Sequence, residues 1–148
     1  MLRLEDCLIE NGGFSLRADL EITPGSRIAV IGPSGAGKST LIEALAGFRP
    51  LSQGAVCWNG DDLTQIEPGK RPIAMLFQDG NLFPHLTVAQ NIGLGIHPNL
   101  RLDDAKQAKV QAALARVGLE GMADRKPAAL SGGQQSRVAL ARVLVQGR

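Results

Sequence analysis

The hydrophobic pattern along the chain contains one clearly alternating segment and two continuous apolar runs. Apolar side chains recur at every second position from Phe14 to Ile22, which predicts a half-buried strand. Residues 2–6 alternate in the same way, and the turn signal Asn11-Gly12-Gly13 joins the two segments into a predicted antiparallel pair. The continuous runs at residues 28–31 and 73–77 predict strands buried on both faces, as in a parallel sheet.

Helical spacing appears in three longer stretches and one short one. Residues 41–48 carry apolar side chains at i, i+4 and i+7, which predicts a helix that ends at a glycine. A second helix is predicted over residues 105–117, after two aspartates, either of which can cap it. Ser131 and Gln134 have the spacing of a capping box and predict the start of a third. A short helix near residues 87–92 completes a mixed pattern of strands and helices.

A glycine-rich segment separates the first apolar run from the first predicted helix. It reads G-x-x-x-x-G-K-S between a strand and a helix, which is the pattern of a phosphate-binding loop. Glycine has no Cβ, so the backbone can turn tightly and bring its N–H groups close to an anion. The helix that follows directs the positive end of its dipole at the same point. The residues that would bind the nucleotide are Gly32, Pro33, Ser34, Gly35, Ala36, Gly37, Lys38, Ser39 and Thr40.

Two side chains of this loop carry chemistry of their own. Lys38 would reach the β- and γ-phosphates, and the Ser39 hydroxyl would hold Mg²⁺. The alternative is an ordinary glycine-rich turn before a helix. Average residue usage produces the pattern by chance in a chain of this length on the order of one time in a hundred. The flanking strand and helix favour nucleotide binding further.

Composition narrows the class of protein only slightly. The 148 residues are 44% hydrophobic and 20% charged, an ordinary globular balance with enough chain for one domain. The net charge of +2 is too small to indicate nucleic acid or an anionic membrane as a partner. No apolar stretch approaches the roughly 18–20 residues of a membrane span. Cys7 and Cys57 match no metal spacing and are interpreted as small buried hydrophobes in a reducing cytosol.

Two further features have a possible role at a nucleotide. Gln78 follows the predicted strand at residues 73–77, on the side where open α/β sheets bind ligands, so its amide could touch Mg²⁺ or an attacking water. A lone glutamine is more often the start of a surface loop. Ser131-Gly132-Gly133 at a helix N-terminus can bind an anion, although alone it also fits a well-capped helix. A two-fold dimer would bring this second site of one chain over the phosphate-binding loop of the other.

Together these motifs resemble the ATP-binding subunits of ATP-binding cassette (ABC) transporters. Residues 32–40 resemble the Walker A motif of that family, Gln78 resembles its Q-loop glutamine, and residues 130–134 match its LSGGQ signature. The LFPHLTV run after Gln78 is typical of its helical subdomain. The sequences MLFQ at residues 75–78 and HLTVAQNIGLG at residues 85–95 more closely resemble the ATPase subunit of the bacterial thiamine importer.

The resemblance implies an α/β fold with a P-loop NTPase (RecA-like) core, an N-terminal antiparallel β part and a helical subdomain. Residues 1–78 and about 137–148 would form the nucleotide-binding core, and residues of about 79–136 the helical subdomain with the signature. Gln78 would act in catalysis and would join Ser39 at Mg²⁺. The residues that would contact ATP bound to a second, identical subunit are Ser131, Gly132, Gly133 and Gln134.

The resemblance also implies partners and a location. ATP binding and hydrolysis by the homodimer would drive two membrane permease subunits between inward- and outward-facing states. A periplasmic solute-binding protein would deliver the solute, thiamine or its phosphates, and would act on the ATPase only indirectly. The subunit would lie peripherally on the cytoplasmic face of the inner membrane, and no nucleic acid partner is expected.

Three features depart from the family pattern. The Walker B aspartate, the catalytic glutamate and the switch histidine are not found among the 148 residues. We therefore interpret the chain as the N-terminal portion of a longer subunit, lacking the C-terminal part of the core, that binds ATP without turnover. The aromatic residue that stacks on adenine in the family is also missing, and Phe14 is the nearest aromatic. The signature continues Gln135-Ser136-Arg137 where Arg-Gln-Arg is common, which leaves its core intact.

Other functions remain as alternatives. A soluble ABC ATPase acting on nucleic acid or ribosomes is disfavoured by the near-neutral charge and by the lack of a coiled-coil insertion between Gln78 and Ser131. A P-loop kinase or GTPase is disfavoured by the LSGGQ sequence. A P-loop module that binds ATP without hydrolysing it is the remaining alternative.

Overall fold

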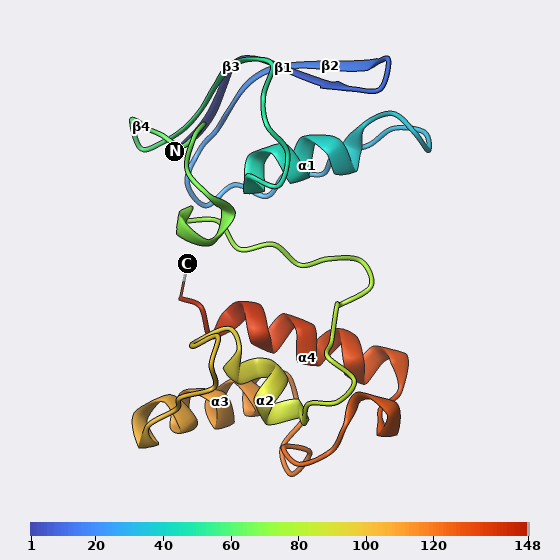
Figure 1. The fold of residues 1–148 in the computed structure, drawn as a ribbon, viewed down its shortest axis with the longest axis vertical. Coiled ribbons are helices and arrows are strands. Elements are labelled where there is room, and N and C mark those ends of the chain that lie inside the picture. Colours follow the sequence, from blue (N-terminus) through green and yellow to red (C-terminus); the bar gives the residue numbers. More distant parts are fainter. Residues whose placement is uncertain (148) are drawn as a thin grey trace. The chain divides into compact units, whose positions relative to one another are not determined.

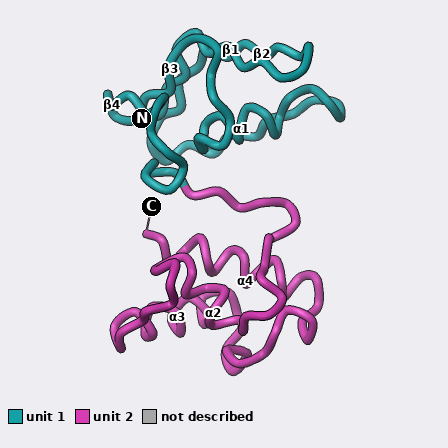
Figure 2. Tube along the Cα trace, in the orientation of Figure 1, with its two compact units in different colours: residues 1–73 teal, residues 74–148 magenta. Residues whose placement is uncertain are grey.

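The computed structural model describes residues 1–147 and divides the chain into two compact units, Met1–Ile73 and Ala74–Arg148 (Figure 2). The domain division predicted from the sequence, with a core segment at residues 137–148, stays a prediction, and Arg148 itself lies outside the described residues.

The first unit contains an antiparallel sheet of four strands in the order β2-β1-β3-β4 (Figure 1). Gly12 and Gly13 both have positive φ and turn β1 back into β2, as the turn signal predicted. The predicted hairpin is therefore confirmed. The strands are β1 (Leu2–Asn11), β2 (Phe14–Ile22), β3 (Gln53–Trp58) and β4 (Asp61–Asp62).

One helix, α1 (Lys38–Ala46), packs its apolar face on this sheet. Leu41 and Leu45 of α1 contact a buried cluster whose members include Leu4 and Val56 from the sheet. Gly47 ends the helix with φ +86°, and its N–H donates to the Ala44 carbonyl at 3.1 Å, as the helix-ending glycine predicted. Both cysteines are buried and free, which confirms their interpretation as small core residues.

Arg71 is a buried arginine at the C-terminal end of α1. Its guanidinium donates hydrogen bonds to the Ala44 and Leu45 carbonyls at 3.0 and 2.8 Å, and also to the Ile66 and Thr64 carbonyls at 2.8 and 3.1 Å. A cation at this end of a helix also interacts favourably with the helix dipole. Burial lowers the pKa of Arg71, while the nearby Asp62 carboxylate raises it. Arg71 therefore joins α1 to the loop that leaves the sheet.

The two predicted parallel strands are wrong. Residues 28–31 and 73–77 lie outside every strand of the described chain, and the side chains of Ile31 and Leu76 are 91% and 49% exposed. A parallel strand needs a neighbour that matches its N–H and C=O groups along its whole length. The four described strands pair among themselves in antiparallel fashion, and none of them lies along either run.

The second unit is helical and consists mainly of α2 (Val88–Gly93), α3 (Asp104–Arg116) and α4 (Gly132–Leu144) (Figure 1). Two short 3-10 helices, η1 (Pro68–Lys70) in the first unit and η2 (Pro127–Ala129) here, complete the elements. The helices predicted near residues 87–92, over residues 105–117 and from Ser131 onward are confirmed. Their caps are the Thr87, Asp103 and Ser131 side chains, which accept hydrogen bonds from the backbone of the first turn. The fully buried core residues of this unit include Val88, Ile92, Leu114, Leu119, Val138 and Ala141.

None of the helices in the described part of the chain has the length and hydropathy that crossing a lipid bilayer requires.

Asn91 holds together the loop that enters α2. Its side chain is 0% exposed, and its Oδ1 accepts from the Phe83 N–H at 2.8 Å. Its Nδ2 donates to the carbonyls of Phe83, Leu86 and Thr87 at 3.0–3.2 Å. A polar side chain is stable at this depth because its hydrogen-bonding groups are satisfied.

We expect Asn91→Ala to lower the free energy of unfolding of the second unit by roughly 3 kcal/mol, because several buried loop groups lose their partner. Amide hydrogen exchange at residues 83–87, followed through denaturant unfolding, measures this loss. Asn99→Ala, at an exposed position of the same unit, is the matched control and should change little. Equal effects of the two substitutions would contradict the role assigned to Asn91.

Candidate functional site

The glycine-rich loop at residues 32–40 leads directly into the first turn of α1. Gly35 and Gly37 have φ of +82° and +88°, a left-handed conformation that glycine adopts without strain. Gly37 is the N-cap of α1 and supplies no side-chain acceptor for the N–H groups of the first turn. These N–H groups and the positive end of the helix dipole therefore remain available to an anion.

Lys38 folds back over the loop that precedes it. Its Nζ donates to the Gly32 carbonyl at 2.8 Å and to the Pro33 carbonyl at 2.7 Å. The two loop carbonyls thus hold the ammonium group against the loop, where a phosphate would add a third, charged acceptor. Ser39, the next residue, is exposed at the start of α1. This arrangement combines a fixed cation, backbone donors and a hydroxyl.

Phe14 packs on the same loop. A Cβ built on Gly37 would lie 2.6 Å from Phe14 Cζ and 3.5 Å from Leu16 Cδ2, so the start of β2 covers this glycine closely. Phe14, the aromatic residue nearest to the position where the family has its adenine-stacking side chain, is therefore in contact with the loop.

Gln78 lies in a tight turn of the second unit. The Gly80 N–H donates to the Phe77 carbonyl at 3.0 Å, and the Gln78 side chain is exposed within this turn. The prediction that Gln78 ends a buried strand is wrong, because no strand forms there. Its proposed catalytic and Mg²⁺ roles stay predictions.

The signature residues form the N-terminus of α4. The Ser131 hydroxyl accepts from the Gln134 N–H at 3.3 Å, and the Gln134 side chain accepts from the Ser131 N–H at 2.9 Å, which confirms the capping box. Gly132 and Gly133 are exposed, and a Cβ at either would meet no atom within 4 Å. This helix end is therefore open to a second molecule, while Gln134 is already engaged locally.

Sequence reasoning missed the polar side chains that fix these segments in place. Arg71 holds the far end of α1, Asn91 holds the loop before α2, and Arg142 of α4 donates to the carbonyls of Gly80 and Asn81. For Asn91 and Arg142, a polar residue inside a helical pattern was the available signal. The α1 carbonyls that Arg71 contacts and the carbonyls that Arg142 contacts are 26 to 62 residues away in the sequence, so no local spacing identifies them.

The described residues contain no group of three or more His, Cys, Asp or Glu side chains that could hold a metal ion. Magnesium in nucleotide sites is bound mostly by phosphate oxygens and water, with one or two protein ligands. The Ser39 hydroxyl beside the phosphate-binding loop is an oxygen donor of this kind and fits a nucleotide-bound Mg²⁺, whereas the Mg²⁺ role of Gln78, in the other unit, stays a prediction.

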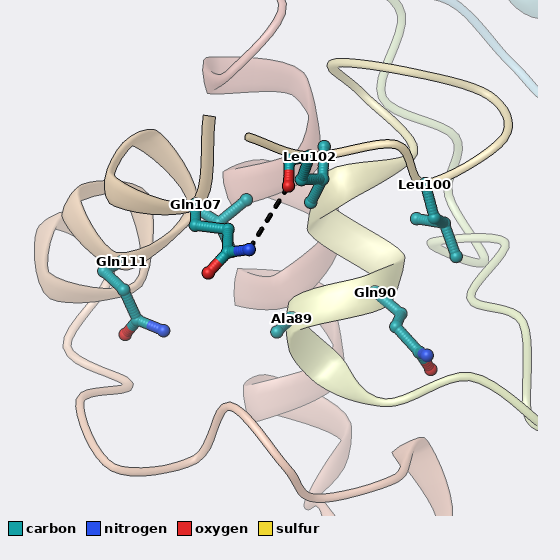
Figure 3. A pocket seen from close by; sticks show the side chains of 7 residues that line it. Ala89, Gln90, Leu100, Leu102, Gln107 and Gln111 are labelled. Atoms are coloured by element: carbon teal, nitrogen blue, oxygen red, sulfur yellow. Dashed lines mark hydrogen bonds between the residues drawn. The ribbon is translucent and has the colours of Figure 1, made fainter. Parts of the chain in front are cut away.

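A cavity of about 270 Å³ lies beside α2 and α3 (Figure 3). Gln107 Nε2 donates to the Leu102 carbonyl at 3.2 Å at its edge. No residue of the phosphate-binding loop, of the Gln78 turn or of the signature lines this cavity, so it is separate from the residues predicted to bind phosphate. Its lining consists of Ala89, Gln90, Leu100, Leu102, Gln107, Val110 and Gln111.

The family described as ABC transporter matches residues 16–148. The chain therefore belongs to the ABC transporter family.

The relatives of this chain include proteins named for one solute. It is 64% identical over 148 residues to "Thiamine import ATP-binding protein ThiQ" of Ruegeria sp. (strain TM1040), covering all of this chain and 64% of that protein. It is 55% identical over 148 residues to the protein of the same name from Cereibacter sphaeroides, again covering all of this chain and 64% of that protein. The chain thus spans a little under two thirds of the length of these relatives.

Solved structures share the fold. The structure described as "Dimeric structure of a post-hydrolysis state of the ATP-binding cassette MJ0796 bound to ADP and Pi" matches with a TM-score of 0.83 and 28% identity. The match covers 99% of this chain and 70% of that one. The fold is therefore the mixed α/β fold of ABC ATPase cassettes, with an antiparallel β part and a helical part.

Proposed function

We propose that this chain binds MgATP as the ATPase subunit of an ABC importer, and that the imported solute is thiamine or its phosphates. The observation that carries the proposal is the 64% identity, over all 148 residues, to a thiamine import ATP-binding protein. The phosphate-binding loop supports it, because Lys38 already lies across the Gly32 and Pro33 carbonyls beside the free N–H groups of α1.

The nucleotide would bind through residues 32–40, with Lys38 on the β- and γ-phosphates. Ser39 would hold Mg²⁺, and Gln78 would contact the ion or the attacking water. The bound ion would neutralise charge on the phosphate oxygens. The residues that the family resemblance assigns to activating water are not found between Met1 and Arg148, so we expect residues 1–148 by themselves to bind MgATP without turnover.

A second copy of the subunit would complete each ATP site. The open end of α4, where Gly132 and Gly133 leave room for a ligand, would contact the γ-phosphate held by the partner. A dimeric assembly is what the related cassette structure is named for. Two permease subunits would receive the motion at the cytoplasmic face of the inner membrane, and a periplasmic solute-binding protein would act through them.

Deleting the gene and measuring uptake of labelled thiamine by the host tests the solute. We expect uptake to be lost and to be restored by the full-length protein. Competition by unlabelled thiamine phosphates compares them with thiamine as the imported solute. Unchanged thiamine uptake would overturn the assignment of thiamine as the solute. Measurements of nucleotide binding would then decide the ATP-binding role separately.

Ser131→Arg tests the role of the signature in the dimer. We expect the monomer to bind MgATP as before, because the phosphate-binding loop lies elsewhere in the chain. ATP-driven dimerisation of the full-length protein should be lost, because a long side chain would occupy the space open beside Gly132. Sedimentation of a hydrolysis-deficient full-length variant with MgATP measures it.

Ser131→Thr is the control for this variant, because threonine keeps the N-cap hydroxyl and adds only a methyl group. It should still dimerise. Loss of monomer binding in Ser131→Arg would show that the signature acts within one subunit and would contradict the proposed contact.

A further inference from the structure

Arg142 connects the helix that starts at Ser131 with the turn that carries Gln78. Its Nη2 donates to the Gly80 carbonyl at 2.7 Å, and its Nη1 donates to the Asn81 carbonyl at 2.9 Å. These partners lie 61 and 62 residues away in the sequence. The two acceptors follow Gln78 by two and three residues along the chain.

The backbone of this turn needs support from outside. Gly80 is buried with φ +65°, and Asn81 has φ +44°, which is uncommon for a residue with a side chain. A Cβ on Gly80 would lie 3.4 Å from the Ala139 Cβ, so the turn sits directly on α4. Ala139 and Arg142 are three residues apart and therefore share one face of that helix.

The charge of Arg142 is compensated mainly by these two carbonyl groups. Among residues 1–147 the ion pairs involve other side chains, and no carboxylate pairs with Arg142. Burial lowers the pKa of Arg142, with no opposing charge to offset it. A partly buried guanidinium without a carboxylate depends on its hydrogen bonds, so the two bonds constrain both the side chain and the turn.

We propose that Arg142 is a positioning residue that fixes the Gln78 turn to α4, so that Gln78 and the signature at Ser131 move as one body. This inference rests on the proposed function, because it gives Gln78 a task at the nucleotide. The phosphate-binding loop belongs to the other unit, so the step affected is catalysis after binding. Gln78, at the nucleotide of its own subunit, and the signature, at the nucleotide of the partner subunit, would then respond together.

Arg142→Met in the full-length protein tests the proposal, because methionine keeps an unbranched apolar stem and removes the guanidinium. Arg137→Met is the matched control: Arg137 lies on the same helix and donates to a carbonyl, that of Val117, at 3.1 Å, away from the Gln78 turn. Arg142→Lys keeps the charge and one or more donors. Steady-state ATP hydrolysis, MgATP affinity and amide hydrogen exchange at residues 79–82 are measured for all three variants.

We expect Arg142→Met to lower kcat about tenfold with Kd and KM for MgATP within about twofold of wild type, because a displaced catalytic group affects the reaction more than binding. Exchange at residues 79–82 should rise in Arg142→Met and stay unchanged in Arg137→Met, and Arg142→Lys should recover part of kcat. Equal kcat and equal exchange in the two methionine variants would overturn the proposal. A wild-type protein without MgATP binding would instead refute the proposed function, and the exchange measurement would still decide whether Arg142 holds the turn.

Discussion

Replacing Lys38 with alanine is expected to remove most of the affinity for MgATP. The substitution deletes the cation that the Gly32 and Pro33 carbonyls hold over the phosphate-binding loop. A hydrogen bond to a charged group contributes about 1.5–3 kcal/mol, so the loss corresponds to roughly a 10- to 100-fold weaker Kd. The loop also loses the contact that closes it, which adds to the effect.

Calorimetric titration of MgATP into the wild-type chain and into Lys38→Ala measures this loss. Lys70→Ala is the matched control, because Lys70 belongs to the same unit, pairs with Glu67 on an exposed surface and does not touch the loop. It should bind as the wild type does. Undiminished affinity in Lys38→Ala would show that the nucleotide site lies elsewhere.

Replacing Gly54 with alanine is expected to have the largest effect on stability. β1 contains a bulge between Leu4 and Cys7, where Asp6 takes a φ of +45°, and Gly54 of β3 lies opposite that bulge. A Cβ on Gly54 would overlap the carbonyl oxygens of Glu5 and Asp6, and its φ of +85° is itself unfavourable for alanine. The atoms that the Cβ would overlap belong to the backbone of β1, so no flexible side chain could move aside.

We expect Gly54→Ala to reduce the free energy of unfolding of the first unit by at least about 3 kcal/mol, within the range reserved for overpacking and backbone strain. Urea unfolding measures it. Gly60→Ala separates the two causes, because Gly60 has φ +96° with open space around it, and should cost only about 1–2 kcal/mol of strain. If both variants were equally stable, the close approach of β3 to the bulge would be refuted.

The parts of the candidate site that the sequence predicted are those whose interacting groups lie within a few residues of one another along the chain. The loop at residues 32–40 needs glycine at particular spacings and a helix directly after it, and a short stretch of sequence is enough to recognise both. The capping box of Ser131 and Gln134 likewise involves groups only three residues apart, so the start of α4 was predictable. The position of Phe14 on Gly37 could not be read in this way, because it depends on how β2 passes over the loop.

By itself, the sequence determined the antiparallel hairpin, the helices with their caps, the phosphate-binding loop and the family. The hairpin, the helices and the loop depend on spacings of two to seven residues, and the family follows from three such local motifs taken together. Only the tertiary structure decided that residues 28–31 and 73–77 form no strand, because pairing requires a neighbouring strand that a hydrophobic run cannot specify. It also decided the roles of Arg71, Asn91 and Arg142, whose side chains are satisfied by carbonyl groups as far as 62 residues away, at places where an unpaired polar group would be costly to bury.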